Sequence, residues 1–552
     1  VHSFPTRRSS DLNYLYTNKK SASSGFKNEV NRYTSRGATS GDFISDFENM
    51  LDPSIKDILI IGMVTPYYSN DELIVWLTAR EGTSGNGFHV FRTRNANAAD
   101  PTAVNWTKLD IPRTDYIKDI EFDPYNTDKL YICYSNSSDQ DSLPFGNKFI
   151  WKADYTDVGN PDFIDITRNL PYAHTGSYCL EYERGSDGVL YLATDFGVFT
   201  TDNQLLNSND SWQKLGVGFP HCHSANGIEI NYPMNLLRVG TEGRGAWELP
   251  LPCRSETTEI EINQNTTWNE DKRLNRGVIV KSGNTLTIAN ARISFPNGAG
   301  IKVEPGAKLV LDNGTLSNAC QGLWQGVLVQ GDPTYDQSNI TNQGVLEMEN
   351  GSIIENAEVA VYVGETFVNN VIAPVSSNPG GGIIKIQGSQ FLNNQKDVVM
   401  RPYELWSTTT QKPIPQASYI RASSFIGDEK MLQDASLLKG KMGCIYTYGI
   451  HGLKIQGNTF ENQNNSISIV DKGTGITAVN SALDISSWDD PQCVTCQPIK
   501  NEFLNLYYGI VITNGIYSSD LIQITNNDFD NTYRNVFLSG TNNAEVLLND
   551  IK

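Results

Sequence analysis

The stretch that decides the fold lies at residues 284–318 and reads NTLTIANARISFPNGAGIKVEPGAKLVLDNGTLSN. Apolar residues alternate there in four short bursts, which are Leu286/Ile288, Ile293/Phe295, Ile301/Val303 and Leu309/Leu311. This alternation predicts short β-strands, each with one buried face, and Gly, Asn or Pro separates each burst from the next. Strands this short usually pair as hairpins, so the stretch alone leaves open whether the chain turns back or coils in one direction.

A motif repeated farther along favours coiling. Each copy has Ser or Asn first, an apolar residue at its centre and Asn or Gly last, at 352–356, 389–393, 423–427, 458–462, 501–505 and 527–531. Seven residues after the central residue a second strand is expected to start, at Val361, Val398, Ile467, Ile510 and Val536; the copy centred on Phe425 breaks this rule. A fixed offset suits one strand per face of a coil, with corner Asn side chains and central Phe rings stacked from turn to turn. We therefore predict a right-handed parallel β-helix over residues 253–552.

This half resembles a class of known proteins. The opening stretch and CQGLWQGVLVQG at 320–331 are similar to the right-handed, pectate-lyase-like β-helix regions of large secreted proteins from bacteria that use type IX secretion. The resemblance implies an extracellular or outer cell-surface location. It does not identify an activity.

A different repeat occupies residues 57–252. Its clearest copy, 189–220, reads VLYLATDFGVFTTDNQLLNSNDSWQKLGVGFP, with strands expected at 190–193, at 197–200 and from Trp212. Earlier copies close at Pro112 and Pro171, and repeats of about 40–55 residues with short strands predict β-propeller blades. About three and a half blades are visible, so 13–252 is expected to be a partial propeller. A short helix is also expected from the spacing of Phe43, Phe47, Met50 and Leu51.

The segments TTDNQ…SW (200–212), LYLATDFGVF (190–199) and GTEGRGAWE (240–248) resemble sortilin-like and Asp-box propellers. The resemblance implies that Asp202, with Thr200, caps a hairpin turn, and that Asp154 lies at the same point of its blade. Arg94 replaces the aspartate in the earlier blade. The implied role of these residues is structural.

The two ends of the sequence carry their own expectations. Residues 1–12 look like the conceptual translation of a sequencing-adapter oligonucleotide, so we exclude them from the fold. N-terminal blades and the end of the β-helix are then expected to be missing. No apolar run approaches about 18 residues, so no membrane span is predicted.

The composition limits the classes of partner that the protein is expected to bind. Asp and Glu outnumber Lys and Arg by 62 to 43, a net charge of −19 that disfavours nucleic-acid binding. Acidic, Asn-rich loops can hold Ca²⁺, although a solvated acidic surface is the favoured explanation. The eight cysteines are too sparse for a disulfide scaffold. Cys493 and Cys496 are expected to form a local disulfide or to stay as free thiols, in preference to half a zinc site.

No catalytic residue is predicted. His451 in TYGIHGLKIQGN (447–458) is similar to the His-containing strand of polygalacturonases, but the paired aspartates those enzymes need are absent upstream, where only Asp428-Glu429 occurs. Asp489-Asp490 lies in an expected loop, where neighbouring side chains point apart, so these two carboxylates are not expected to converge as a catalytic pair. Further candidates weighed were a metal cluster at His221-Cys222-His223 and a Ca²⁺-binding edge, or else a corner ladder, at Asn527, Asp528, Asp530 and Asn531.

Aromatic residues scattered over the β-helix are a different lead, because exposed rings can stack on sugar rings. They are Trp324, Tyr362, Trp406, Tyr446, Tyr448, Tyr507 and Tyr508. We expect Tyr507, Tyr508 and Trp324 to contact a glycan. The sequence thus favours a non-enzymatic protein that adheres to, or binds, polysaccharide or another surface component. The main alternative is a polysaccharide lyase or glycoside hydrolase that acts on the β-helix face, and the second is a structural stalk. The sequence identifies neither the ligand nor the oligomeric state.

Overall fold

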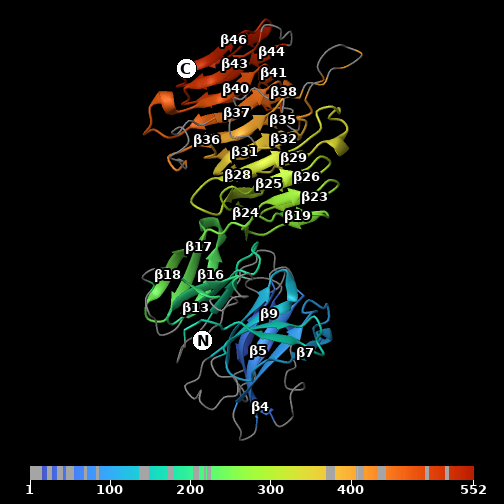
Figure 1. Cartoon of the computed structure of the whole chain (residues 1–552), viewed down its shortest axis with the longest axis vertical. Coiled ribbons are helices and arrows are strands. Elements are labelled where there is room, and N and C mark those ends of the chain that lie inside the picture. The colour runs from blue at the N-terminus through green and yellow to red at the C-terminus, as the bar shows by residue number, and fades with distance from the viewer. Residues whose placement is uncertain are drawn as a thin grey trace. The chain divides into compact units, whose positions relative to one another are not determined.

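The computed structural model describes residues 15–552 except for 21–27, 34–41, 45–54, 67–70, 82–85, 136–147, 172–178, 203–204, 206–210, 217–218, 220–224, 368–378, 404, 406, 408, 410–413, 415, 432–442, 492–495 and 516–520. The chain forms two compact units, Val1–Leu251 and Pro252–Lys552. Nearly all of the regular structure is β-strand (Figure 1).

The first unit consists of antiparallel sheets formed by strands that follow one another along the chain. One sheet contains β4 (Ile55–Val64), β5 (Leu73–Glu81), β6 (Asn86–Thr93) and β7 (Trp106–Leu109). The next contains β8 (Ile117–Asp123), β9 (Asn126–Tyr134), β10 (Ile150–Asp154) and β11 (Asp162–Asp165). A third contains β12 (Cys179–Tyr182), β13 (Leu190–Thr194), β14 (Gly197–Thr201) and β15 (Gln213–Leu215).

Two smaller sheets complete this unit. One contains β16 (Ala225–Asn231), β17 (Leu236–Thr241) and β18 (Gly245–Pro250), and the other β1 (Leu15–Lys20), β2 (Asn28–Tyr33) and β3 (Asp42–Phe43). The first strands β4, β8, β12 and β16 contact one another in sequence, as the inner strands of propeller blades do. The propeller prediction is confirmed for these four blades.

Alternation along a blade strand explains why the blades pack face to face. On β13, Leu190 and Leu192 join the apolar core shared with the preceding blade, whereas Tyr191 and Ala193 join the core shared with the following one. Strand β13 therefore buries both faces. The turns are held by side chains: Asp154 accepts hydrogen bonds from the backbone N–H and hydroxyl of Thr156, and Asp202 accepts one from the N–H of Leu205.

The expected helix around residues 43–51 is only partly tested. Phe43 ends strand β3, so the helical interpretation is wrong at that position. Phe47, Met50 and Leu51 lie outside the described residues.

The second unit is a parallel β-helix. Its strands form three parallel sheets, each with ten strands in the described part of the chain, and successive strands visit the three sheets in rotation (Figure 1). Sheet I contains β19 (Ile260–Ile262), β22 (Val278–Val280), β25 (Gly300–Val303), β28 (Trp324–Val329), β31 (Ala357–Val363), β34 (Lys396–Met400), β37 (Gly443–Tyr448), β40 (Thr474–Val479), β43 (Tyr508–Thr513) and β46 (Arg534–Ser539).

Sheet II contains β20 (Thr266–Trp268), β23 (Thr285–Ala289), β26 (Lys308–Asp312), β29 (Val345–Glu349), β32 (Ile383–Gln387), β35 (Tyr419–Arg421), β38 (His451–Gln456), β41 (Ala482–Ser486), β44 (Ile522–Thr525) and β47 (Ala544–Leu547). Sheet III contains β21 (Lys272–Arg273), β24 (Arg292–Phe295), β27 (Thr315–Asn318), β30 (Ile353–Glu355), β33 (Gln390–Leu392), β36 (Ser424–Gly427), β39 (Thr459–Asn462), β42 (Asn501–Leu504), β45 (Asn527–Asp530) and β48 (Asp550–Ile551). The four bursts of residues 284–318 lie on β23, β24, β25 and β26, and all eight of their apolar residues are buried. These strands pair in parallel with strands of neighbouring turns, so the chain coils in one direction and does not fold into hairpins.

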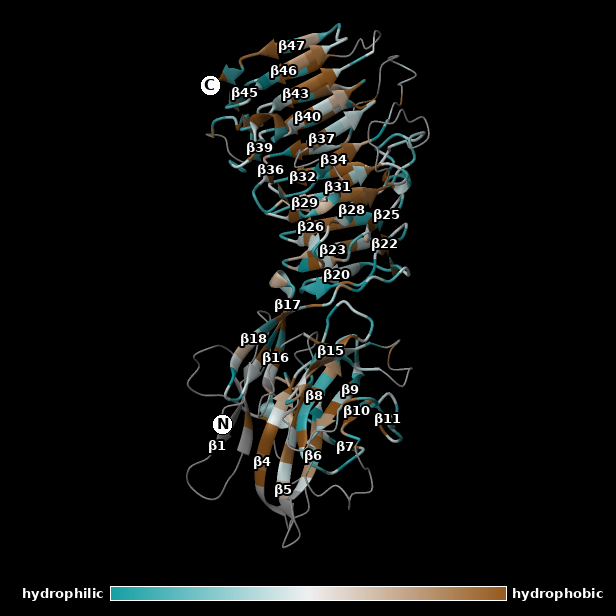
Figure 2. Ribbon diagram, turned by 60° about the vertical axis from the view of Figure 1, so that its left-hand side comes forward, coloured by the Kyte–Doolittle hydropathy of each residue, from teal (hydrophilic) through white to brown (hydrophobic). Residues whose placement is uncertain are grey.

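The interior is a set of stacked columns. Phe391, Phe425, Phe460, Phe503 and Phe529 stack on successive turns, with neighbouring ring centroids 4.8–4.9 Å apart and planes within 2–10°. At the corner between sheets II and III, the side-chain amide of Asn501 donates to Asn527, and that of Asn527 donates to Asn549. Apolar positions recur along the stacked strands in Figure 2. Both predicted stacks, Phe inside and Asn at the corners, are confirmed.

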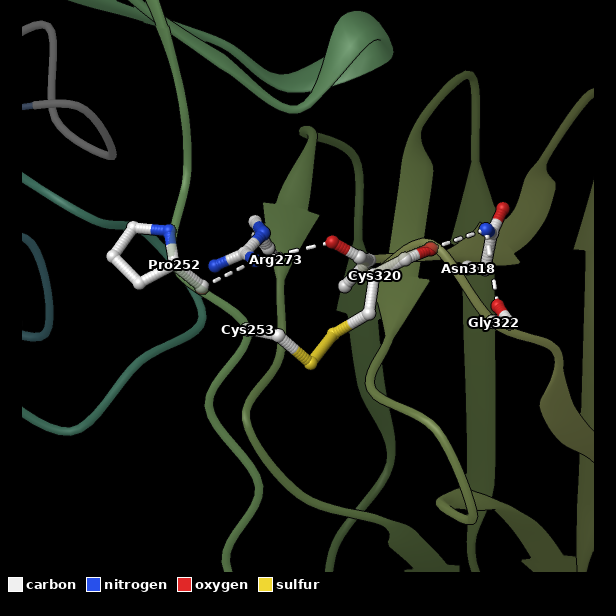
Figure 3. Close-up of a disulfide and its surroundings, with 7 residues drawn as sticks. Pro252, Cys253, Arg273, Asn318, Cys320 and Gly322 are labelled. Carbon is white, nitrogen blue, oxygen red and sulfur yellow. Dashed lines mark hydrogen bonds between the residues drawn. A yellow bond between two sulfur atoms is a disulfide. The ribbon is translucent and has the colours of Figure 1, made fainter. Parts of the chain in front are cut away.

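The expected strand starts at Val361, Val398, Ile510 and Val536 lie inside strands β31, β34, β43 and β46, which begin two to four residues earlier. Two further details differ from the sequence prediction. Ile467 does not start a strand, because residues 463–473 form an extra loop with a 3₁₀ turn at Ile469–Asp471, and β40 begins at Thr474. A disulfide that the sequence did not predict joins Cys253 to Cys320, 67 residues apart (Figure 3). Beside it, Nη2 of Arg273 donates to the carbonyl oxygens of Pro252 and Ala319.

Candidate functional site

The tyrosines predicted to contact a glycan lie at the corner between sheets III and I. The backbone N–H groups of Tyr507 and Tyr508 both donate to the carbonyl of Gly473 on the turn before. Their rings meet edge to face with centroids 4.6 Å apart. Both side chains are half-buried, so the corner exposes parts of two rings rather than one.

The next turn adds a third tyrosine and a cation. Tyr533 stacks on Tyr507, with centroids 5.1 Å apart and planes 8° apart, and 59% of Tyr533 remains exposed. Arg534 is paired with Tyr508 across the sheet, and its Nη1 donates to the Tyr508 hydroxyl at 3.0 Å. We call Tyr507, Tyr508, Tyr533 and Arg534 the tyrosine cluster. It combines stacked aromatic rings with a held guanidinium group.

The outer face of sheet I continues away from the cluster. Side chains in register on four successive strands form one column, which contains Tyr446, Thr477, Val511 and Phe537. Phe537 is 40% exposed, and Tyr446 is half-buried. The spacing of strands in a sheet makes this column roughly 14 Å long. The surface is flat and carries aromatic, apolar and hydroxyl groups but no carboxylate in this column.

Trp324 does not belong to this surface, and its predicted glycan contact is wrong. It is fully buried, stacks on Phe295 at 4.9 Å, and donates its indole N–H to the carbonyl of Glu355. A register shift at Gly326, which has a φ of 107°, causes the difference. The positive φ of Gly326 interrupts the alternation, so Trp324 and Val327 both face the interior, whereas strict alternation from Val327 places Trp324 outside.

Of the other aromatic residues, Tyr362 does face outward but is not exposed. It lies in an apolar layer with Leu328 and Val399, and Phe367 packs over it with ring centroids 5.6 Å apart. Tyr448 is half-buried near Arg401, and Trp406 lies outside the described residues.

The residues weighed for catalysis have structural partners or stand apart. His451 is half-buried at the start of β38. The Asp428 carboxylate accepts hydrogen bonds from the Asn393 amide and from the N–H of Lys430, so it holds a corner. Asp489 is exposed next to Trp488, which pairs with Ile499 in an isolated bridge.

The acidic edge is also structural. Asn527 is buried in the inner Asn column, and Asn531 donates to Asn505 at the outer corner. Asp528 pairs with Lys500, which also pairs with Asp550. Among the residues the structure describes, no group of three or more His, Cys, Asp or Glu side chains is placed to hold a metal ion. The hydrogen bonds of Asn527 and Asn531 to neighbouring turns agree with the corner-ladder interpretation of 527–531.

The cysteine and histidine motifs are tested in part. Cys496 is disulfide-bonded, whereas Cys493 and the His221-Cys222-His223 segment lie outside the described residues. No helix in the described ranges is long and apolar enough to cross a membrane.

One titratable group has a strongly shifted pKa inside the coil. Burial raises the pKa of the Asp397 carboxyl to about 8, and hydrogen bonds from Asn394 and Cys444 only partly oppose this. Burial likewise raises the pKa of the Cys444 thiol well above its usual value. A shifted pKa often marks an active site, but both groups are fully enclosed, so no polymer can reach them.

The sequence did not predict Tyr533 and Arg534, although a signal was present. Tyr507 and Tyr533 each follow the central Phe of their motif copies, Phe503 and Phe529, by four residues. Equivalent positions on successive turns of a β-helix lie above one another. The repeat therefore predicts the Tyr507–Tyr533 stack once the coil is accepted.

Comparisons with known proteins do not identify a function for this chain. No known protein family matches the chain, and no characterised protein matches it in sequence. A solved structure of a variant of the α-L-arabinofuranosidase Arb93A from Fusarium graminearum, bound to an iminosugar inhibitor, is similar at 16% identity and a TM-score of 0.25. That match covers 46% of this chain and 66% of the other. A similarity this weak supports no inference about activity.

Proposed function

We propose that this protein binds polysaccharide or another glycan-bearing surface component without cleaving it, and that the tyrosine cluster is its contact site. The observation that carries the proposal is the packing of the Tyr507, Tyr508 and Tyr533 rings along the corner between sheets III and I. A ring held in place by its neighbours loses little conformational entropy when it stacks on a sugar. The flat column from Tyr446 to Phe537 extends the surface along which a polymer can lie.

The proposal places the protein outside the cell, on the surface or in the medium. The Cys253–Cys320 disulfide and the disulfide at Cys496 support this, since such bonds persist mainly in oxidising compartments. The type IX route and the Asp-box nature of the propeller turns rest on the sequence resemblance. The hydrogen bonds that Asp154 and Asp202 accept in their turns are in keeping with a capping role.

The test is affinity electrophoresis of the full chain through gels that contain one polysaccharide each, neutral or acidic. The wild-type chain should be retarded by at least one polymer, and Tyr533→Ala should lower that affinity about fivefold or more. Tyr335→Ala is the matched control, because Tyr335 is an exposed tyrosine of the same unit, 47% exposed, away from the cluster. Equal retardation of Tyr533→Ala and wild type would place the contact site elsewhere. Retardation by no polymer would favour a structural stalk.

A further inference from the structure

The outer face of sheet II carries a second polar surface, which does not include the tyrosine cluster. Lys385, Tyr419 and Lys454 lie in register on three adjacent strands. A parallel column beside them contains Gln387, Arg421 and Gln456. We call these six residues the sheet II patch. Three of the six are cationic and none is acidic, in a chain whose net charge is −19.

Arg421 is held in a fixed orientation within the patch. Its guanidinium group lies over the Tyr419 ring, 4.4 Å from the centroid, and its Nε donates to Oε1 of Gln456. Gln456 is fixed in turn, because its Nε2 donates to Ser486. Neither Nη1 nor Nη2 of Arg421 bonds to any of the described residues. The two terminal nitrogens of Arg421 are therefore held in a fixed orientation and remain available to donate hydrogen bonds to a ligand.

Carboxylates flank the patch at its two ends, because Glu347 is in register with Lys385 and Asp484 with Lys454, but they do not neutralise all three cations. No ion pair joins Lys454 to the described part of the chain, and its side chain is exposed. Lys385 pairs with Glu347 at 3.2 Å, but Glu347 also pairs with Lys308 at 2.6 Å, so one carboxylate serves two lysines. Lys385 and Lys454 are two strand spacings apart, roughly 10 Å. An anionic group placed between them relieves the repulsion among the three cations.

From this arrangement we infer that the sheet II patch binds the anionic groups of an acidic glycan, a carboxylate or a sulfate ester carried on a sugar ring. A guanidinium group with both terminal nitrogens free matches the two oxygens of such a group in a bidentate manner. Lys385 and Lys454 supply charge on either side, and the sheet is flat enough for an extended chain. The inference extends the proposed function, because it specifies acidic glycans and adds a second contact surface.

The experiment measures affinities of the full chain for polygalacturonate, dextran sulfate and unmodified dextran. Arg421→Gln should bind the acidic polymers about tenfold more weakly, and Lys454→Gln about threefold more weakly. Arg421→Lys should fall between wild type and Arg421→Gln, because it keeps the charge and loses the paired donors. Lys302→Gln, which removes a cation from the outer face of sheet I, is the matched control and should change the affinity less than twofold. The thermal midpoint of each variant checks that it folds.

The two acidic polymers separate the two sources of anion: a loss confined to polygalacturonate assigns a carboxylate, and one confined to dextran sulfate assigns a sulfate. Equal binding of both polymers by wild type and Arg421→Gln overturns the inference. A chain that is retained by dextran and by neither acidic polymer also overturns it, while leaving the proposed function standing. If Arg421→Gln weakens binding and Tyr533→Ala does not, the result supports the sheet II patch as a binding site and argues against the tyrosine cluster as one.

Discussion

Replacing Asp397 by Asn should remove a specific pH dependence from the stability of the β-helix. The carboxyl is fully buried, and burial raises its pKa from 3.8 to about 8. Between these two values the folded chain keeps a proton that the unfolded chain has released. Stability therefore falls as the pH rises, by about 1.4 kcal/mol per pH unit, until the folded group ionises near pH 8. Between pH 6 and 8 the wild type should lose about 2–3 kcal/mol through this group alone.

Asn has nearly the same shape and does not titrate, so Asp397→Asn should lack this loss. The neighbouring thiol gives a local assay, because Cys444 is a buried free cysteine hydrogen-bonded to Asp397. A short pulse of thiol reagent, applied across a urea series at pH 6, 7 and 8 and read by mass spectrometry of the Cys444 peptide, gives the unfolding midpoint of this region. The free energy difference between variant and wild type should grow in favour of the variant with pH. A difference that stays constant from pH 6 to 8 refutes the buried, protonated carboxyl.

Three further changes test the columns and the cross-link. Phe425→Ala should cost about 3–5 kcal/mol in urea unfolding, because the ring is enclosed between two others, whereas Phe537→Ala on the outer face should cost less than about 1 kcal/mol. Asn501→Ala should cost about 2–3 kcal/mol, since its buried amide bonds both neighbouring turns; a cost near zero argues against the corner column. Opening the Cys253–Cys320 disulfide by Cys253→Ser should cost about 4 kcal/mol for a closed loop of 67 residues, and reducing agent should lower the thermal midpoint of the wild type by more than that of the variant, because the variant has one disulfide fewer to lose.

The fold class was predictable from the sequence because a β-helix repeats one local pattern many times. Each copy of the motif places its central apolar residue, which is Phe in five of the six copies, inside and its polar residues at corners, so the signal adds up along the chain. The prediction fails where a single residue breaks the period. Gly326 shifts the register and turns Trp324 inward, and the loop at 463–473 moves the start of β40 from Ile467 to Thr474.

The candidate site was predictable only in part. Tyr507 and Tyr508 could be selected because two adjacent residues before a strand cannot both be buried, but their partners depend on which turns lie next to each other. The sheet II patch is harder still, since Lys385, Arg421 and Lys454 come from three turns separated by loops of unequal length. The distances between these three side chains depend on the register of their strands, and the register depends on the lengths of the inserted loops. The same holds for the Cys253–Cys320 pairing.

Binding without cleavage is the central claim, and one measurement tests it most directly. The full chain is incubated with each polysaccharide that retards it, and the reaction is followed for new reducing ends and for the ultraviolet absorbance of unsaturated sugars. The account predicts retardation with neither product after prolonged incubation, for wild type and for Tyr533→Ala alike. New chain ends that accumulate in proportion to the amount of wild-type protein would contradict it and show that the chain has lyase or hydrolase activity.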